Sequence, residues 1–475
     1  MSSKISLTLV DGARIVVPDS LDRLTPYVLQ EQGDWFEDEI KFLRCFLLPG
    51  HNVIDIGANF GVYTLSMAKA VGDAGHVWAF EPASKTAGFL RDGVAANDFQ
   101  NVTIEQKGLS NVSGTAELSL HDNPEFNSLA NKEKPGASPN YETVDIVTLD
   151  EFWDFDNEQR VTFVKIDAEG EEANVIRGGS RFFTNQSPLI QYEIKASDNV
   201  QMELVSEFSA KGYRSYRLVV GLQILVPFDI DSPYDPSLLN LFCCKPDCAD
   251  GLETRNILTQ DVPDTSAKRD HCVQAAWDRL DRDRTQFLRD YFAALPYAQK
   301  LLPAWENAAK SPEYQEVEEP LAAYVLSLST DLSARERFAA LESSYLQFKS
   351  LTNKQPSRMR LASFARIAEA YGARTVALSA LNQLGALIKQ TQGADLSEPF
   401  ITPAPRFDLI DPGQEMHNWV ISSVLEGMER NSGYSSYNTG KRALGRLENL
   451  CRLGFSGEEM PRRLALIKKR FGLND

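Results

Sequence analysis

The stretch "NVIDIGANFGVYTL", residues 52–65, contains an apolar run, a glycine-rich turn and the beginning of a helical pattern. A strand that ends in such a turn and leads into a helix is typical of the opening unit of a doubly wound α/β sheet. The turn reads Asp55-x-Gly57-x-Asn59-x-Gly61. In a dinucleotide fingerprint the last glycine comes three residues after the second. Here Gly57, Asn59 and Gly61 follow one another at intervals of two residues. The spacing therefore argues against a dinucleotide site.

The turn resembles the first motif of class I S-adenosylmethionine methyltransferases, with Asn59 in place of the middle glycine. S-adenosylmethionine has no pyrophosphate; it presents a zwitterionic methionine end and a ribose. Bare glycine backbone lets the methionine end approach, and the Asn59 amide can hydrogen-bond its carboxylate or ammonium. On the next strand, "AFEP" places Glu81 at the carboxyl end, where a carboxylate can accept both ribose hydroxyls. The turn and the acidic residue predict the same cofactor.

Composition and charge restrict the other classes of function. The chain has 475 residues, enough for two or three domains, and a net charge of −17. Its pI is about 4.9 and it has no long basic run, which argues against nucleic acid as a partner. The first residues lack a signal-peptide pattern, no stretch approaches a membrane span, and the six cysteines are scattered, so we expect a cytoplasmic protein with structural cysteines.

Four segments carry a resemblance to the FkbM family of methyltransferases: "VIDIGANFG", "AFEP", "VKIDAEGEEANVIRGG" and "YEIK". The resemblance covers roughly residues 30–245. It implies an α/β fold, with a Rossmann-like class I methyltransferase sheet of seven strands, the last antiparallel. It also implies S-adenosyl-L-methionine as cofactor and O-methylation of a hydroxyl, commonly of a sugar. The family pattern places these residues at the cofactor: Glu37, Asp55, Gly57, Asn59, Gly61, Glu81, Gly108 and Leu109.

The rest of the chain divides by composition. Two β-branched runs around Asp11-Gly12 predict a hairpin, and strands and helices alternate from 52 to about 245. Beyond a polar stretch the pattern is almost wholly helical, which predicts an all-α C-terminal domain. Segment 364–384 matches one tetratricopeptide unit without a clear second copy, so a helical repeat and an irregular helical domain both stay open. The predicted parts are a hairpin extension (1–30), the methyltransferase domain (31–250), a linker (251–269) and the helical domain (270–475).

Three carboxylates are the candidates for catalysis. Asp167 ends the most apolar strand, beside the point where α/β sheets bind ligands, and suits a general base for a hydroxyl. Glu169 follows on the turn and Glu193 ends the next strand, so both are expected near the same crevice. Asp167 with Glu193 could instead hold a divalent cation, although no firm set of oxygen ligands favours this. For Glu172 we expect a structural role at a helix N-terminus.

These observations predict an S-adenosylmethionine-dependent O-methyltransferase that acts on a hydroxyl of a sugar in a glycan, polysaccharide or glycolipid. A small polyketide-like or amine acceptor is the competing enzyme hypothesis. A non-catalytic scaffold is the hypothesis of a different class, in which the helical domain binds a protein partner or a second copy of the chain. Loss of the glycine turn, Glu81 or Asp167 would have favoured the scaffold, and all three are present.

Overall fold

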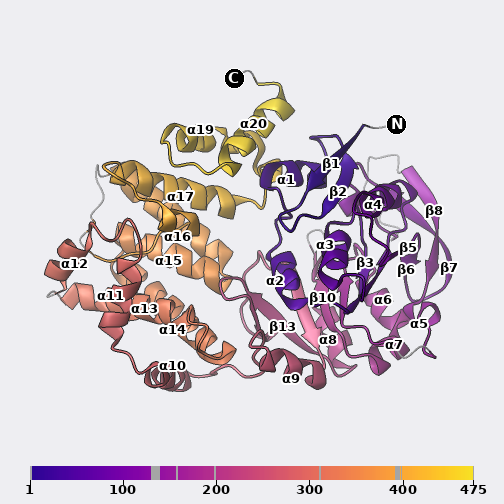
Figure 1. Cartoon of the computed structure of the whole chain (residues 1–475), viewed down its shortest axis with the longest axis horizontal. Coiled ribbons are helices and arrows are strands. Elements are labelled where there is room, and N and C mark those ends of the chain that lie inside the picture. The colour runs from indigo at the N-terminus through magenta and orange to yellow at the C-terminus, as the bar shows by residue number, and fades with distance from the viewer. Residues whose placement is uncertain are drawn as a thin grey trace. The chain divides into compact units, whose positions relative to one another are not determined.

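The fold is described from a computed structural model, which describes residues 3–129, 140–156, 159–196, 199–309, 312–390, 396 and 398–473. The chain forms two compact units (Figure 1). The first comprises Met1–Leu218, Pro227–Pro233 and Leu238–Thr254. The second comprises Val219–Val226, Tyr234–Ser237 and Arg255–Asp475. Each unit is described by itself.

The centre of the first unit is a mixed sheet, in which the neighbouring strands follow the order β13-β15-β10-β9-β3-β4-β5. Strands β10, β9, β3, β4 and β5 run parallel, and β15 is antiparallel to both β10 and β13. The expected seven strands with an antiparallel last strand are therefore confirmed, while most of β14 belongs to the second unit. The bounds are β3 Asn52–Ile56, β4 His76–Phe80, β5 Val102–Glu105, β9 Phe163–Ile166, β10 Leu189–Glu193, β13 Arg214–Val219, β14 Ile224–Pro227 and β15 Asn240–Cys244.

The chain order of the strands reverses at β3, because β4 and β5 lie on one side of it and β9 and β10 on the other. Sheets of this kind bind ligands beyond the carboxyl ends of the strands at such a point. The glycine-rich turn follows β3 directly, and Asp167 follows β9. The topology therefore brings the two main sequence motifs to one edge of the sheet.

Helices cover both faces of this sheet. On one face, Phe42 of α2 contacts Phe242 of β15, Phe46 contacts Phe163 of β9, and Leu90 of α4 packs on Ala79. On the other face, α5 to α8 pack over the alternate residues Ile54 and Ile56. The bounds are α1 Leu24–Gln32, α2 Asp38–Phe46, α3 Val62–Val71, α4 Ser84–Ala96, α5 Leu149–Phe152, α6 Glu172–Gly178, α7 Ser180–Asn185, α8 Glu203–Ser209 and α9 Pro246–Thr254.

Period-two alternation decides which polar residues meet. Asp55 and Lys165 are paired in register on the parallel strands β3 and β9, and side chains alternate between the two faces of a sheet. Both belong to the face opposite the apolar cluster that contains Ile54 and Val164. These two polar side chains therefore belong to the face covered by α2 and α3.

Small sheets surround the central one. Strands β1 (Lys4–Thr8) and β2 (Arg14–Pro18) form an antiparallel hairpin whose loop, residues 9–13, contains Gly12 at φ 82°. The strand-like segment 101–109 forms two strands: β5 belongs to the central sheet, and β6 pairs with β8 in another. The polar pair Gln106-Lys107 separates them. The remaining bounds are β6 Gly108–Leu109, β7 Gly114–Leu120, β8 Asn140–Val147, β11 Lys195–Ala196 and β12 Asn199–Val200.

The second unit is mainly helical, and each of the helices from α13 to α16 packs against the next one in the chain. Gly372, at φ 93°, ends α15 and precedes α16 in the chain. Phe364 and Ile367 of α15 and Ala380 of α16 are buried. None of the described helices combines the length and apolar character that crossing a membrane requires. The bounds are α10 Ser266–Leu280, α11 Arg284–Ala293, α12 Leu302–Ala308, α13 Pro312–Ser327, α14 Ala334–Lys354, α15 Arg358–Tyr371, α16 Arg374–Gln390, α17 Met416–Ser432, α18 Ser436–Thr439, α19 Leu444–Arg452 and α20 Glu459–Phe471, with the 3₁₀ turns η2 Pro405–Leu409 and η3 Gly440–Ala443.

Candidate active site

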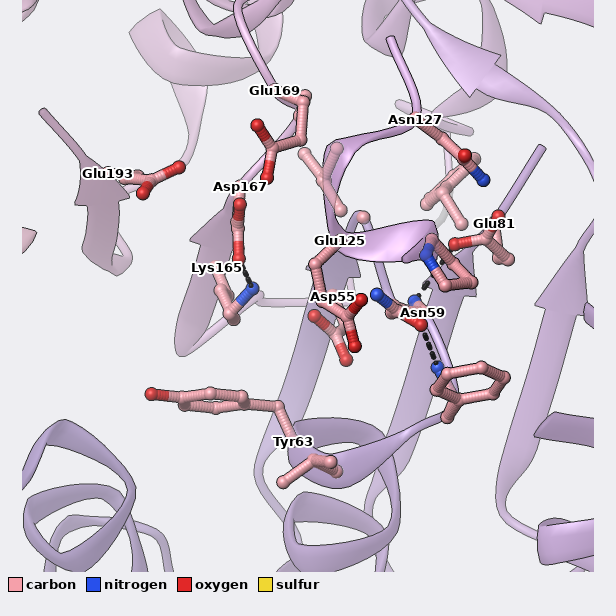
Figure 2. A pocket seen from close by; sticks show the side chains of 18 of the residues that line it. Asp55, Asn59, Tyr63, Glu81, Glu125, Asn127, Lys165, Asp167, Glu169 and Glu193 are labelled. Atoms are coloured by element: carbon pink, nitrogen blue, oxygen red, sulfur yellow. Dashed lines mark hydrogen bonds and ion pairs between the residues drawn. The ribbon is translucent and has the colours of Figure 1, made fainter. Parts of the chain in front are cut away.

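A cavity of about 240 Å³ lies beyond the carboxyl ends of β3, β4, β9 and β10 (Figure 2). Such a volume is close to the lower end of the range for small-molecule sites, about 300–1,000 Å³. Of the eleven residues that the sequence placed at the cofactor or in catalysis, ten line this cavity. They are Glu37, Asp55, Gly57, Asn59, Glu81, Gly108, Leu109, Asp167, Glu169 and Glu193. The exception is Gly61, where an added Cβ would lie 2.4 Å from a methyl carbon of Leu90, so this glycine serves the packing of α4.

The turn after β3 needs glycine for two reasons. Gly57 has φ 80°, in the left-handed region that residues with a side chain rarely adopt. A Cβ at Gly57 would also lie 1.7 Å from the carbonyl oxygen of Asp167. The turn and the end of β9 therefore touch through bare backbone. Asn59, at φ 49°, holds the left-handed conformation as an asparagine, one of the residues that tolerate it best.

Glu81 is fixed in the cavity wall by two backbone amides. Its Oε2 accepts a hydrogen bond from the Asn59 amide at 2.9 Å, and its Oε1 accepts one from the Ala83 amide at 2.9 Å. Burial raises the pKa of Glu81 to about 7, although these two amides oppose the shift. Each carboxylate oxygen has more than one lone pair, so Glu81 can accept further hydrogen bonds from a ligand.

A buried lysine, which the sequence reading missed, stands at the centre of the site. The Nζ of Lys165 donates to Oδ2 of Asp167 at 2.8 Å and lies 4.9 Å from the ring centroid of Tyr63. Burial alone would lower the pKa of Lys165, but the carboxylates of Asp167, Asp55 and Glu37 raise it above its ordinary value. The signal was present in the sequence, as the one charged residue inside the apolar run "VTFVKI".

Glu37 and Asp55 are tied to helix α3. The Tyr63 hydroxyl donates to Oε2 of Glu37 at 2.5 Å, and the Thr64 hydroxyl donates to Oδ2 of Asp55 at 2.5 Å. Burial raises the pKa of both carboxyl groups. The negative charge of Asp167 adds to the raised pKa of Glu37 and to that of Asp55. The negative charge of Glu37 in turn adds to the raised pKa of Glu193. Glu37 therefore interacts with the Asp167 side of the cavity as well as with α3.

The three predicted catalytic carboxylates come together. Asp167, Glu169 and Glu193 each have a carboxylate oxygen within 4.8 Å of the others (Figure 2). Burial raises the pKa of Glu169 and of Glu193, and the negative charge of Asp167 adds to both shifts. The Lys165 ammonium donates a hydrogen bond to the carboxylate of Asp167 and forms an ion pair with it. The group thus combines an ion-paired carboxylate with two carboxyl groups that bind protons more readily than usual.

Glu172 has the structural role that the sequence predicts. Its carboxylate accepts hydrogen bonds from the amides of Ala168 and Gly170 and from the side-chain amide of Gln201. These contacts hold the turn after β9, on which Glu169 sits at φ 50°. Glu172 thereby orders the residues that face the cavity.

The cavity wall is strongly acidic. Eight carboxyl-bearing residues line it, against two lysines, Lys107 and Lys165. Besides the six acidic residues already expected there, the acidic set includes Glu125 and Glu171. Carboxylates this close to one another repel each other, and they would also repel an anionic ligand. The wall therefore favours a cationic or hydrogen-bond-donating ligand.

Comparison with known proteins identifies the family of this domain. Residues 55–215 match the family described as the methyltransferase FkbM domain. The first unit carries an FkbM methyltransferase domain. The match begins at Asp55 of the glycine turn and includes Glu81 and the three catalytic candidates.

A curated relative of the FkbM domain is "Methyltransferase 1" of Beauveria bassiana (strain ARSEF 2860). It is 27% identical over 143 residues, which is 26% of this chain and 57% of the relative. The chain thus spans just over half the length of that relative.

Solved structures show weaker likenesses. Methyltransferase FkbM from Methylobacillus flagellatus KT is 15% identical, with 41% of this chain and 43% of that chain covered and a TM-score of 0.29. The M. jannaschii TYW2 in complex with AdoMet is 12% identical, with 51% and 85% covered and a TM-score of 0.28. At these TM-scores the assignment rests on the family match and on the strand order, not on these structures.

The residues present fit S-adenosylmethionine, the cofactor that an FkbM methyltransferase domain implies. Glu81 offers its carboxylate where the ribose is expected, and the acidic wall suits a ligand with a sulfonium and an ammonium. Buried carboxylate oxygens without a hydrogen-bond partner among the described residues, such as Oδ1 of Asp55, are acceptors that a ligand can satisfy.

The raised pKa of Glu81 predicts a pH dependence of cofactor binding. A ribose hydroxyl donates to the carboxylate but cannot donate equally well to the protonated acid. We therefore expect the dissociation constant for S-adenosylmethionine to fall by up to about tenfold between pH 6 and pH 8, measured by calorimetry. Glu81→Gln should bind more weakly and lose this dependence. A wild-type constant that stays flat over this range would contradict the prediction.

The same pKa has a consequence for stability. Because the folded pKa is above the ordinary value of 4.5, the folded state holds the Glu81 proton more tightly than the unfolded chain. This contribution is fully present below about pH 4.5 and is lost as the pH rises through about 7. Cofactor binding through Glu81 therefore improves over the pH range in which its contribution to folding disappears.

Proposed function

We propose that the chain is an S-adenosylmethionine-dependent O-methyltransferase whose acceptor is a hydroxyl of a sugar in a glycan, polysaccharide or glycolipid. The observation that carries the proposal is the meeting of Asp167, Glu169 and Glu193 next to the glycine turn and Glu81 in one cavity. Several carboxyl groups at one place can accept from and donate to the neighbouring hydroxyls of a sugar ring.

The charge of the cavity supports a neutral acceptor. With eight carboxyl-bearing residues and two lysines in its wall, the cavity repels phosphates, so a phosphorylated group or a nucleic acid is a poor acceptor. Trp35 and Phe36 also line it and offer apolar surface. Aromatic surface beside hydrogen-bonding groups suits a sugar, which has both apolar and polar faces.

Bound S-adenosylmethionine supplies a methyl group on a sulfonium, already activated for transfer. The protein must hold the acceptor oxygen in line and remove its proton. Asp167 is the base in this proposal, because Lys165 fixes the orientation of its carboxylate through the 2.8 Å hydrogen bond. Glu169 and Glu193, within 4.8 Å, hold the neighbouring hydroxyls. Glu81 holds the ribose.

Asp167→Asn tests this division of roles. We expect the variant to bind S-adenosylmethionine within about threefold of the wild type but to lose methyl transfer by about 10²–10⁴-fold, the range that a lost general base costs. The assay is transfer of a labelled methyl group to a panel of oligosaccharides and glycolipids. Asp122→Asn, at an exposed carboxylate outside the cavity wall, is the matched control and should retain full activity. Full activity of Asp167→Asn would remove this residue from catalysis.

The same panel separates the alternatives. Polyketide-like hydroxyls and primary amines should be included, because an acidic wall also attracts an amine. Transfer to amines alone would replace O-methylation by N-methylation. Adding EDTA tests whether a divalent cation takes part at Asp167 and Glu193; our proposal expects no effect. Absence of transfer to every acceptor, with cofactor binding intact, would favour a scaffold.

Two further expectations from the sequence stay predictions. They are a cytoplasmic location, and a protein partner or a second copy of the chain bound through the helical domain.

A further inference from the structure

A short segment between β7 and β8 contributes a carboxylate that the mechanism above does not use. The 3₁₀ turn η1 (Pro124–Phe126) carries Glu125, which lines the cavity together with Asn127. In the view of Figure 2, Glu125 is drawn between the group around Asp167 and the side that holds Asn59 and Glu81. This segment contains no recognisable motif.

The segment is anchored to the beginning of helix α1. Oδ1 of Asn123 accepts a hydrogen bond from the Leu24 amide at 2.8 Å. Oε1 of Glu125 accepts one from the Thr25 amide at 3.1 Å and another from the Thr25 hydroxyl. Two successive amides at the start of α1 thus donate to side chains of Asn123, directly before η1, and of Glu125 within it. The anchoring fixes the position of the Glu125 carboxyl group but uses only one of its two oxygens.

The second oxygen, Oε2, is buried and has no hydrogen-bond partner among the described residues. Burial also raises the pKa of Glu125, as expected for a carboxylate that lacks compensation. A buried acceptor without a partner is costly, and such groups in native proteins usually meet a ligand, an ion or water. Because Glu125 lines the cavity, a ligand bound there can donate a hydrogen bond to its Oε2.

We propose that Oε2 of Glu125 accepts a hydrogen bond from the α-ammonium of the methionine part of S-adenosylmethionine. The proposal rests on the proposed function. Glu81 is assigned to the ribose and the Asp167 group to the acceptor, which leaves the methionine end for the residues between them. Oδ1 of Asp55 is buried without a partner in the same cavity wall. An ammonium has three N–H donors and can satisfy both oxygens, and charge-assisted hydrogen bonds of this kind are among the strongest.

Glu125→Gln tests the proposal, because it keeps the shape of the side chain and removes its charge. The two main probes are S-adenosylmethionine and 5′-methylthioadenosine, a neutral thioether that keeps the adenosine but lacks the amino-acid part. S-adenosylhomocysteine, a thioether that keeps the α-ammonium, should be weakened as S-adenosylmethionine is; if it is not, Glu125 faces the sulfonium and the proposal is overturned. By calorimetry we expect Glu125→Gln to weaken S-adenosylmethionine about 10- to 100-fold and to leave 5′-methylthioadenosine unchanged. Asp122→Asn removes the same charge from an exposed position of the same segment and should change neither constant.

Thr25→Val provides a second test. It removes the hydroxyl that holds Oε1 but leaves the Thr25 amide in place. We expect it to weaken S-adenosylmethionine by a smaller factor, again without effect on 5′-methylthioadenosine. Thermal unfolding of both variants without ligand establishes that they are folded.

Each outcome decides the matter. Equal weakening of both ligands would mean that Glu125 shapes the cavity as a whole, and unchanged binding of both would mean that it contacts neither; either result overturns the proposal. A raised KM for the acceptor with unchanged cofactor binding would place Glu125 at the acceptor and overturn it as well. If the intact protein binds neither ligand, the proposed function itself fails, which this design distinguishes from a failure at Glu125.

Discussion

Gly57→Ala is expected to abolish S-adenosylmethionine binding and to destabilise the first unit by more than about 4 kcal/mol. Two costs add. The φ of 80° is unfavourable for alanine, which accounts for about 1–2 kcal/mol. The new Cβ would also lie 1.7 Å from the Asp167 carbonyl oxygen, a backbone atom that can move only if β9 moves. The carboxylate group at the end of β9 would move with it.

Gly50→Ala is the matched control for this variant. Gly50 has φ 88°, and an added Cβ would meet nothing within 4 Å. It therefore carries the conformational cost without the collision, and we expect a loss of only about 1–2 kcal/mol with cofactor binding retained. Denaturant unfolding and calorimetry measure both quantities. Equal destabilisation by the two variants would show that the contact between the turn and β9 has no energetic importance.

Lys165→Met is expected to have the second large effect. The lysine compensates the charges of Asp167, Asp55 and Glu37, and its side chain is only 4% exposed. Removing the lysine leaves the buried carboxylate of Asp55 and the 34% exposed carboxylate of Asp167 without compensation. A fully buried pair would cost about 3–5 kcal/mol, and solvent at Asp167 places the expected cost at the lower end of this range, about 3 kcal/mol. We expect a loss of stability of this size and a loss of methyl transfer, because Asp167 would no longer be oriented.

Two further variants test whether the loss of the buried lysine charge causes the effect of Lys165→Met. Lys107→Met removes the other lysine of the cavity wall, whose side chain is 41% exposed and whose nitrogen lies 3.3 Å from Glu105. A pair of that exposure contributes less than about 1 kcal/mol. Combining Lys165→Met with Asp167→Asn should restore part of the stability, since the charge that Lys165 paired with is then removed as well. If Lys165→Met is no more harmful than Lys107→Met, the buried lysine does not organise the site.

The sequence predicts the parts of this site that depend on local patterns. The turn Asp55-x-Gly57-x-Asn59-x-Gly61 requires left-handed backbone, which few residues besides glycine and asparagine adopt easily, and this makes it recognisable. The sheet follows from apolar runs that alternate with helical periodicity. Glu81, Asp167 and Glu193 were placed because parallel strands bring their carboxyl ends to one edge.

What the sequence does not predict depends on contacts between distant segments. The hydrogen bonds of Glu125 join residues 100 positions apart in the chain, and nothing local marks that glutamate as a cavity residue. The pairing of Lys165 with Asp167 depends on which face of β9 the lysine occupies, and this follows from the register with β3. Gly57 was expected to make room for the cofactor; its close approach to Asp167 emerges only from the fold.

The most direct test of the central claim is a calorimetric titration of the intact protein with S-adenosylmethionine, with NAD as the comparison and Glu81→Ala as the variant. We predict a micromolar dissociation constant for S-adenosylmethionine, no detectable binding of NAD, and a loss of at least about tenfold in Glu81→Ala, since one carboxylate with two ribose hydroxyls contributes hydrogen bonds to a charged group. No binding of S-adenosylmethionine, or binding that Glu81→Ala leaves unchanged, would contradict the account.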